Sequence, residues 1–464
     1  MPEVLFLRNI EIDGVPGLDL RIEDGSVAEI GPRLAGRGES LDGRGGALIP
    51  GFHDHHIHIL ATAARSSSLD VTPIRDRALF ETLARGYALR LRGEDWLRVT
   101  GYHESHLGPL DLAELDRLFP DAPVRIEHQT GALWFVNSRG LARLDLTDAP
   151  AGVERDATGR PTGRIVRENA WLRLRTSGSF PPLSDLGAQL AAFGLTGLTD
   201  ATVSTEQAAA DYLFEARQRG AMPQRMVLMS GEPLISPGDG VEIGPRKFLL
   251  DDHTLPDIDQ TIEVVNGLRS ENRAAAAHCV TDIQLAYMLA VFDAVGGRRG
   301  DRIEHGSVIP RSAIGRLSEF ELTVVTQPAF VAERGDRYLQ DHPPEVLDDL
   351  YRCASLLEHG VRVAAGSDAP YGNPDPWLAM RAAATRLTRD GAVLGPGERV
   401  DAARALGLYL CGAHDPGGPM RRVTPGAPAD LCLLGAPMME ILEALDADLV
   451  RATMVAGQLV YLRD

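Results

Sequence analysis

The segment Gly51-Phe-His-Asp-His-His-Ile-His58 is rich in side chains that can bind a metal ion. On a β-strand, residues two apart point to the same side, so Asp54, His56 and His58 share one face. A His-x-His pair on the inward face of a sheet can hold one metal ion through two imidazole nitrogens. A chance cluster of histidines, or a surface loop that scavenges metal, is the alternative interpretation of this segment alone.

Three further ligand-type residues, His278, His305 and Asp368, each end a short apolar run of the chain. A single histidine at the end of a strand is more often a structural residue than a ligand. Three such residues in order after the His-x-His pair favour one shared metal centre, because parallel barrels build their active sites at the C-terminal ends of the strands.

Of the 47 lysine and arginine residues in the chain, only Lys247 is a lysine. A coding bias towards arginine explains why the other basic residues are all arginine. A lysine that is retained despite this bias is a candidate for a role that a guanidinium cannot perform. The lysine amine can lose its proton when it is desolvated, whereas arginine stays charged. Carboxylated by CO2, the amine becomes a carbamate whose two oxygens can bridge two cations. A surface lysine before a strand is the alternative.

Short apolar runs alternate with helix-like stretches along the body of the chain, which is typical of parallel βα units. Eight of these runs are candidate barrel strands: 47–58, 195–203, 225–230, 246–250, 274–280, 302–307, 322–327 and 360–368. Their number and spacing predict an α/β fold with a (β/α)8 TIM barrel over residues 47–422.

Two other parts of the chain do not fit one barrel unit each. The gap after the first candidate strand is far longer than one helix, and its β-like runs predict an inserted subdomain at about 97–175. Residues 1–46 and 423–464 alternate short β-like runs with turn signals. We therefore expect both termini to form one small β-sandwich domain.

Composition limits the class of protein. The net charge of −18 disfavours nucleic acid and anionic membranes as partners. The N-terminal residues lack the pattern of a signal peptide and no apolar run approaches the length of a membrane span, so we expect a cytoplasmic protein. Four widely spaced cysteines predict neither a disulfide framework nor a thiolate metal site. A small-molecule substrate is the expected partner, and a homo-oligomer is compatible with the sequence.

Several phrases spread over nearly the whole chain match one known family. They are Pro50-Gly-Phe-His-Asp-His-His-Ile-His, Phe135-Val-Asn-Ser-Arg-Gly-Leu141, Gly159-Arg-Pro-Thr-Gly-Arg-Ile-Val-Arg-Glu168, Arg302-Ile-Glu-His, Gln327-Pro328, Gly366-Ser-Asp-Ala-Pro370 and Thr424-Pro-Gly-Ala-Pro-Ala-Asp-Leu. With them the chain resembles the amidohydrolase superfamily, and more narrowly family 3, which includes metal-dependent hydrolases similar to N-substituted formamide deformylase.

The resemblance implies a binuclear metal centre and a hydrolytic reaction. His56 and His58 would hold one divalent ion together with Asp368, His278 and His305 would hold the other, and carboxylated Lys247 would bridge the two. Zinc is the expected metal because it suits mixed imidazole and carboxylate ligands. A hydroxide held between the ions would attack the C–N bond of an amide, N-acyl or N-formyl substrate, with Asp368 as the catalytic proton carrier.

The chain also departs from the family pattern in ways that leave the substrate open. The usual histidine before the Asn-Ser pair is absent from Thr130-Gly-Ala-Leu-Trp, and His278-Cys-Val-Thr-Asp282 replaces the usual phrase after strand five. A heterocycle deaminase with the same ligands and a catalytically silent binding protein are the alternative functions. Candidates for substrate selection lie in the insertion and the strand-end loops: His103, Glu104, His106, Arg125, His128, Trp134 and Tyr371.

Overall fold

The computed structural model describes residues 4–66, 68–89, 96–176 and 180–463. The chain forms two compact units, one made of Met1–Ile59 with Leu183–Asp464 and the other of Leu60–Pro182. Among the described helices, none is long and apolar enough to cross a membrane.

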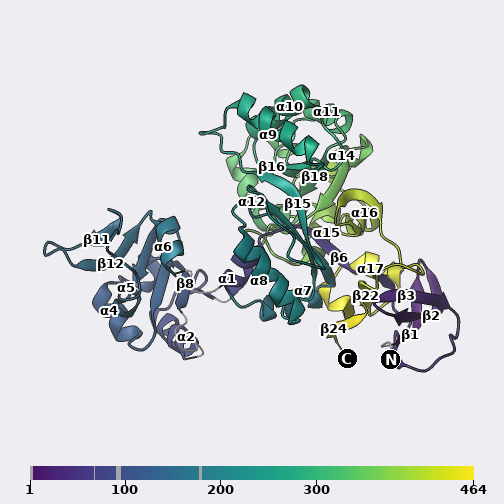
Figure 1. The fold of residues 1–464 in the computed structure, drawn as a ribbon, viewed down its shortest axis with the longest axis horizontal. Coiled ribbons are helices and arrows are strands. Elements are labelled where there is room, and N and C mark those ends of the chain that lie inside the picture. Colours follow the sequence, from purple (N-terminus) through teal and green to yellow (C-terminus); the bar gives the residue numbers. More distant parts are fainter. Residues whose placement is uncertain (1–3, 67, 90–95, 177–179, 464) are drawn as a thin grey trace. The chain divides into compact units, whose positions relative to one another are not determined.

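The first unit is built around an eight-stranded parallel sheet that curls into a nearly closed barrel (Figure 1). Its strands, in the order in which they lie side by side, are β6 (Phe52–Ile57), β13 (Leu195–Asp200), β14 (Arg225–Ser230), β15 (Val241–Phe248), β16 (Ala275–Cys279), β17 (Arg302–His305), β18 (Thr323–Thr326) and β19 (Arg362–Ala365). Most of these strands are buried on both faces, as expected of a parallel sheet covered by helices. The predicted barrel is confirmed, and each of the eight expected runs contains one of its strands. The first run, 47–58, also contains Leu48–Pro50, which pairs with the C-terminal sheet instead.

The fourth strand differs from its expected bounds. It begins at Val241, five residues before the expected start at 246, and it ends at Phe248. Gly244 and Pro245 lie inside it, and both residue types normally signal a turn rather than a strand. Because Gly244 and Pro245 are typical of a turn, the sequence does not predict the first half of β15.

Backbone hydrogen bonds join the first and last strands beside the expected ligands. The amide of Asp368 donates to the carbonyl of His56 at 2.7 Å, and the amide of His58 donates to the carbonyl of Ala369 at 2.8 Å. A glycine is required here, because a Cβ on Gly366 would lie 2.5 Å from the backbone nitrogen of His56. This close approach holds the ends of β6 and β19 together.

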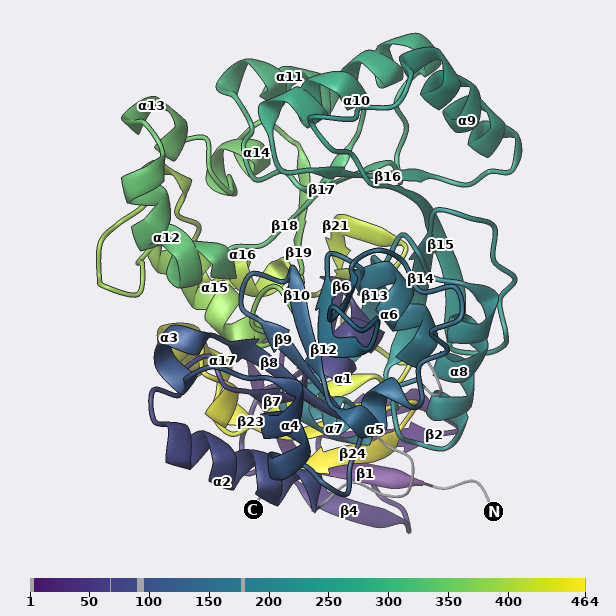
Figure 2. The same ribbon diagram turned by 90° about the vertical axis from the view of Figure 1, so that its left-hand side faces the viewer.

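Helices cover the outside of the barrel, and Figure 2 shows α9 to α11 outside strands β16 and β17. Side-chain caps fix several of their starts; Thr281, for example, accepts from the amide of Gln284 at the start of α10. The helices of this unit are α7 (Ser184–Ala192), α8 (Gln207–Gln218), α9 (Ile258–Ser270), α10 (Asp282–Val295), α11 (Ile314–Glu319), α12 (Ala329–Asp341), α13 (Pro344–Leu347), α14 (Ala354–Glu358), α15 (Pro376–Thr385), α16 (Ala402–Gly407) and α17 (Met438–Ala444).

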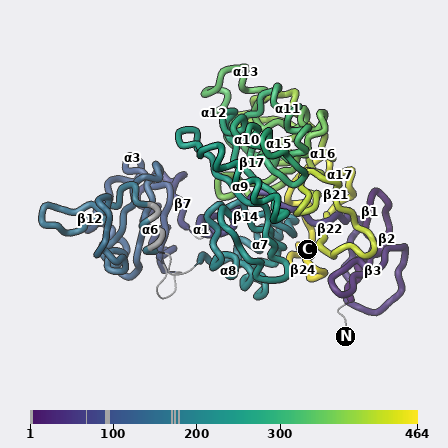
Figure 3. The backbone as a smooth tube through the Cα atoms, turned by 45° about the horizontal axis from the view of Figure 1, so that its top comes forward, coloured from purple at the N-terminus to yellow at the C-terminus, as the bar shows by residue number. Residues whose placement is uncertain are grey.

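The two ends of the chain lie side by side within the first unit (Figure 3). One four-stranded sheet contains β3 (Ser26–Gly31), β2 (Val15–Glu23), β1 (Leu5–Ile12) and β4 (Glu39–Asp42), and another contains β24 (Gln458–Leu462), β23 (Val450–Val455), β22 (Leu431–Leu434) and β5 (Leu48–Pro50). Leu7, Leu20, Leu431 and Met454 belong to one shared apolar core between them. A two-stranded ribbon, β20 (Cys411–Gly412) with β21 (Asp415–Met420), lies between the barrel and the C-terminal sheet in the sequence.

The second unit contains a six-stranded sheet with both parallel and antiparallel pairs. The strands, in spatial order, are β11 (Val153–Arg155), β12 (Pro161–Val166), β10 (Leu133–Val136), β9 (Val124–His128), β8 (Leu97–Tyr102) and β7 (Leu69–Asp70). Its helices are α1 (Ile59–Ser66), which begins at the unit boundary, α2 (Arg77–Ala88), α3 (Glu104–Leu107), α4 (Leu112–Leu118), α5 (Ser138–Leu141) and α6 (Asn169–Thr176). The segment expected as an insertion, about 97–175, lies inside this unit.

The Asn-Ser pair of the second unit has a structural role. The buried side chain of Asn137 accepts from the amides of Val124 and Gly140, both at 2.9 Å, and donates to the carbonyl of Ala122 at 2.8 Å. It therefore fastens strand β9 to the start of helix α5, which explains the Phe135-Val-Asn-Ser phrase without any role in chemistry.

Candidate metal centre

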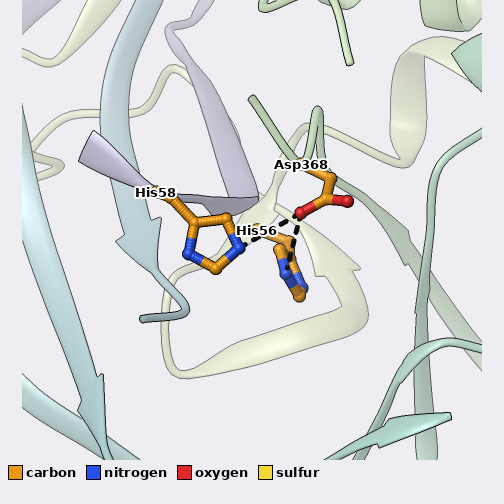
Figure 4. Close-up of side chains that lie close together, drawn as sticks. All are labelled: His56, His58 and Asp368. Atoms are coloured by element: carbon orange, nitrogen blue, oxygen red, sulfur yellow. Dashed lines mark ion pairs between the residues drawn. The ribbon is translucent and has the colours of Figure 1, made fainter. Parts of the chain in front are cut away.

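Three of the expected ligands converge at the point where β6 and β19 meet (Figure 4). His56 lies in β6, His58 follows it directly, and Asp368 follows β19. One carboxylate oxygen of Asp368, Oδ1, lies 3.2 Å from Nε2 of His58 and 3.5 Å from Nε2 of His56. One ligand atom from each of the three residues lies within 4.8 Å of the other two, so the group could hold a metal ion.

The other three expected ligands come from neighbouring strands β15, β16 and β17, but they are not part of that tight group. The ring of His305 lies 4.6 Å from the ring of His56 and 4.5 Å from the ring of His278, centre to centre. Nδ1 of His305 lies 3.9 Å from Oδ2 of Asp368. Lys247 is buried in β15, where it lies opposite Ala276 of the neighbouring strand, two residues before His278.

A buried carboxylate orients the ring of His56. Glu304 in β17 accepts a hydrogen bond from Nδ1 of His56, which leaves the Nε2 lone pair free for a cation. Arg302 holds this carboxylate in turn, donating from Nε to Oε1 at 2.6 Å, and it also donates to the carbonyl of His55 at 2.7 Å. Both Arg302 and Glu304 are almost completely buried.

Two other histidines are oriented in the same manner. Nδ1 of His305 lies 3.0 Å from Oε1 of Gln327, an amide oxygen that can only accept, so Nε2 of His305 is also free of its proton. Nδ1 of His58 lies 2.8 Å from the hydroxyl of Thr202. A histidine that ligates metal usually donates its other ring N–H to an oxygen in this way.

These supporting residues were not found in the sequence analysis. Glu304 is 248 positions from the histidine that it orients, and Thr202 is 144 positions from His58. Glu304 and Gln327 do lie within phrases that carry the family resemblance, Arg302-Ile-Glu-His and Gln327-Pro328. These two phrases could therefore have drawn attention to Glu304 and Gln327, whereas no pattern in the sequence pointed to Thr202.

Burial favours the neutral, metal-binding form of three candidate histidines, His56, His278 and His305. Burial, together with the charge of Lys247, lowers the pKa of His278 to about 4. Burial also lowers the pKa values of His56 and His305 well below the usual range. The pKa of the Lys247 amine is lowered for the same reason, although Glu304 and Asp368 oppose the shift.

Several of these atoms are buried without satisfying their hydrogen-bonding capacity. Nε2 of His56, Oδ1 of Asp368 and Nζ of Lys247 have no hydrogen-bond partner in the part of the chain that the structure describes. Leaving a buried polar atom unpaired costs about 1–3 kcal/mol. Cation ligands are the simplest account of such atoms at one place, so the residues fit a metal centre.

The backbone at two candidate ligands is strained. His305 has φ +69° and Asp368 has φ +55°, a left-handed conformation that is uncommon for residues other than glycine. Such strain is typical of functional sites, where the surrounding structure holds a residue in an unfavourable conformation.

A second group of ligand-type residues, His103, Glu104 and His128, lies in the second unit. Here Nδ1 of His103 accepts from the amide of Ser105 at 3.1 Å, and Nδ1 of His128 accepts from the amide of Thr130 at 3.3 Å. A neutral ring whose Nδ1 accepts carries its proton on Nε2, and His128 uses that nitrogen to bond Glu104 at 3.0 Å. Nε2 of both rings is thus set to donate, so this group is a poorer metal site than the first.

The remaining candidates for substrate selection fall into two classes. Trp134 is buried in the core of the second unit, and its ring faces the guanidinium of Arg125 at 5.9 Å, so it packs rather than lining a site. Burial lowers the pKa of Arg125 to about 10. Tyr371 is different, because it is largely exposed and its ring lies 5.6 Å from the ring of His58.

Comparison with known proteins identifies the family. The sequence profile of the amidohydrolase family matches residues 39–461. The chain belongs to the amidohydrolase family. Among its relatives in this family are two bacterial proteins, each 25% identical to this chain. YtcJ of Bacillus subtilis (strain 168) matches over 91% of this chain and 90% of its own length, and the N-substituted formamide deformylase of Arthrobacter pascens over 84% of each.

A solved structure has the same fold. An uncharacterized metal-dependent hydrolase of Pyrococcus horikoshii OT3 superposes with a TM-score of 0.74 at 21% identity, covering 93% of this chain and 97% of the other. The predicted resemblance to amidohydrolase family 3 is confirmed by the family match, and the predicted barrel by this superposition.

Proposed function

We propose that this amidohydrolase is a metal-dependent enzyme that hydrolyses a C–N bond in a small amide, N-acyl or N-formyl compound. The observation that carries the proposal is the state of the ligand atoms. Glu304 and Gln327 orient His56 and His305 with their Nε2 lone pairs free, and three nearby buried polar atoms have no hydrogen-bond partner among the described residues. The names of two similar proteins, a deformylase and a metal-dependent hydrolase, support the same reaction class.

We assign two divalent cations, with zinc as the expected metal, to six side chains of this unit. They are His56, His58, Lys247, His278, His305 and Asp368. When bound, such cations would supply Lewis acidity, which lowers the pKa of water and polarises a substrate carbonyl. A single ion held by His56, His58 and Asp368 is the arrangement that remains if Lys247 is unmodified.

Lys247 would serve as a carbamate. Its neutral amine attacks the carbon of CO2, a new N–C bond forms, and one proton leaves the nitrogen. Burial favours this reaction because it lowers the pKa of the amine and so increases the neutral fraction. The product replaces a cation with an anion that has two oxygen ligands.

Asp368 would carry the proton. Its carboxylate lies between His56 and His58, and its Oδ1 atom is not engaged in a hydrogen bond with any described residue. A carboxylate in this position can accept the proton of the attacking water and deliver it to the nitrogen that leaves. The nitrogen departs as an amine or ammonia, and the acyl carbon keeps the hydroxyl.

The test is a hydrolysis assay on protein that has been stripped of metal and then reloaded. Release of amine, ammonia and carboxylic acid is measured across simple amides, formamides and an aminated heterocycle. Activity on amides that disappears with a chelator and returns with zinc supports the proposal. Activity that survives complete metal removal, or ammonia release from the heterocycle alone, contradicts it.

A further inference from the structure

Tyr371 is fixed beside the candidate metal centre by its backbone rather than by its ring. Its amide donates to the carbonyl of Asp368 at 2.8 Å, and its carbonyl accepts from Arg334 at 2.5 Å. The ring stands perpendicular to the ring of His58, at 5.6 Å and 87°, while the residue is 62% exposed. An aromatic side chain is thus held at a ligand of the metal with most of its surface open.

Two more large apolar side chains are exposed just after ligand-bearing strands, one in a loop and one in the first turn of helix α10. Leu249, 58% exposed, lies two residues after Lys247, and Ile283, 52% exposed, lies five residues after His278. A hydrogen bond joins the two segments, since the hydroxyl of Thr281, the residue before α10, donates to Asp252 in the loop after β15 at 2.9 Å. Both segments follow the C-terminal ends of strands that carry expected ligands, which is the face where parallel barrels build their ligand sites.

The charges of these segments disfavour an anionic substrate. Asp251 and Asp252 lie in the loop after β15, Asp282 begins helix α10 after β16, and the whole chain has a net charge of −18. The cation next to Tyr371, Arg334, is already engaged, because its guanidinium lies 3.8 Å over the ring of Phe330 and donates to the Tyr371 carbonyl. A carboxylate-bearing substrate would meet acidic side chains on these segments.

We infer that the substrate is an uncharged amide with an apolar substituent, and that Tyr371 is the residue that selects it. This inference rests on the proposed hydrolase function and specifies its substrate class. The ring of Tyr371 would cover the apolar substituent, while the polar amide faces the ligands. Each methylene that becomes covered strengthens binding about fourfold, so three added methylenes with partial cover give about tenfold.

The experiment compares N-methylformamide, N-butylformamide and N-formylglycine as substrates of the metal-loaded enzyme and of two variants. Tyr371→Phe keeps the aromatic ring and serves as the matched control for Tyr371→Ala. We expect kcat/KM of the wild type to be about tenfold higher for the butyl than for the methyl compound. Tyr371→Ala should raise KM for the butyl compound about tenfold, so that the preference for the butyl over the methyl compound disappears. Tyr371→Phe should keep that preference.

Binding of N-butylacetamide, N-methylacetamide and N-acetylglycine, measured by calorimetry, separates this inference from the proposed function. A protein that cleaves none of the formamides but binds the butyl compound in a Tyr371-dependent manner refutes the hydrolase function and keeps the apolar site. Equal kcat/KM for the methyl and butyl compounds, or preference for N-formylglycine, overturns the inference while the hydrolase function stands. A protein that shows neither cleavage nor Tyr371-dependent binding overturns both the inference and the proposed hydrolase function.

Discussion

The replacement Glu304→Gln tests the arrangement that makes His56 a ligand. Glutamine has nearly the same shape, but it lacks the negative charge that accepts from Nδ1 of His56 and pairs with Arg302. The amide can also turn its NH2 group towards the histidine, which would then present a lone pair at Nδ1 and a proton at Nε2. The ring would no longer offer Nε2 to the cation.

Two magnitudes follow from the burial of this pair. Loss of a group that orients a metal-bound histidine typically weakens metal binding 10–100-fold, or about 1.4–2.8 kcal/mol. Removing one partner of a buried ion pair costs about 3–5 kcal/mol of folding stability. We expect the lower end for Glu304→Gln, because Arg302 keeps its hydrogen bond to the carbonyl of His55.

The assay is a zinc competition with a chromophoric chelator, run beside urea unfolding of the metal-free protein. Glu242→Gln is the matched control, since Glu242 also pairs with a histidine, His414, at 2.6 Å, but both side chains are more than half exposed. We expect no measurable change in the control, because exposed ion pairs contribute little. A Glu304→Gln protein that binds zinc as tightly as the wild type would refute the assigned role of Glu304.

Three further predictions concern the same centre. Lys247→Arg should lower kcat/KM at least 100-fold, and Lys247→Ala should regain activity when acetate is added in place of the carbamate. An active Lys247→Arg enzyme would refute the carbamate assignment. The metal-free protein should lose stability as the pH falls from about 6.5 to about 4, because the unfolded state binds a proton at His278 that the buried ring in the folded state does not bind. His278 alone should account for up to about 3 kcal/mol of this loss, and a flat profile of unfolding midpoint against pH would contradict it. Gly366→Ala should cost about 1–3 kcal/mol and weaken zinc binding, because its Cβ would meet the backbone of His56, whereas Gly397→Ala has open space and should change neither; equal behaviour of the two variants would disprove the close approach.

The sequence was informative where chemistry and periodicity coincide. An apolar run that ends in a ligand-type residue marks both a strand and its C-terminal end, which is why His278, His305 and Asp368 could be placed before the fold was known. The start of β15 could not be placed in advance, because Gly244 and Pro245 are residues typical of turns. In the structure they lie inside the strand, where pairing with β14 outweighs their local preference.

The network that orients the ligands was beyond prediction from local pattern. Glu304 and His56 come from strands far apart in the sequence, and only the folded barrel brings them together. In the same way, the sequence could not distinguish His103 and His128 from the histidines assigned to the proposed metal centre. That distinction depends on which ring nitrogen accepts a backbone amide, and only coordinates reveal it.

The metal content of the purified protein tests the central claim most directly. We predict two divalent ions per chain in the wild type by plasma mass spectrometry, and no more than one in Lys247→Arg. A folded wild-type preparation that contains no bound metal and still hydrolyses its substrate would contradict the whole account.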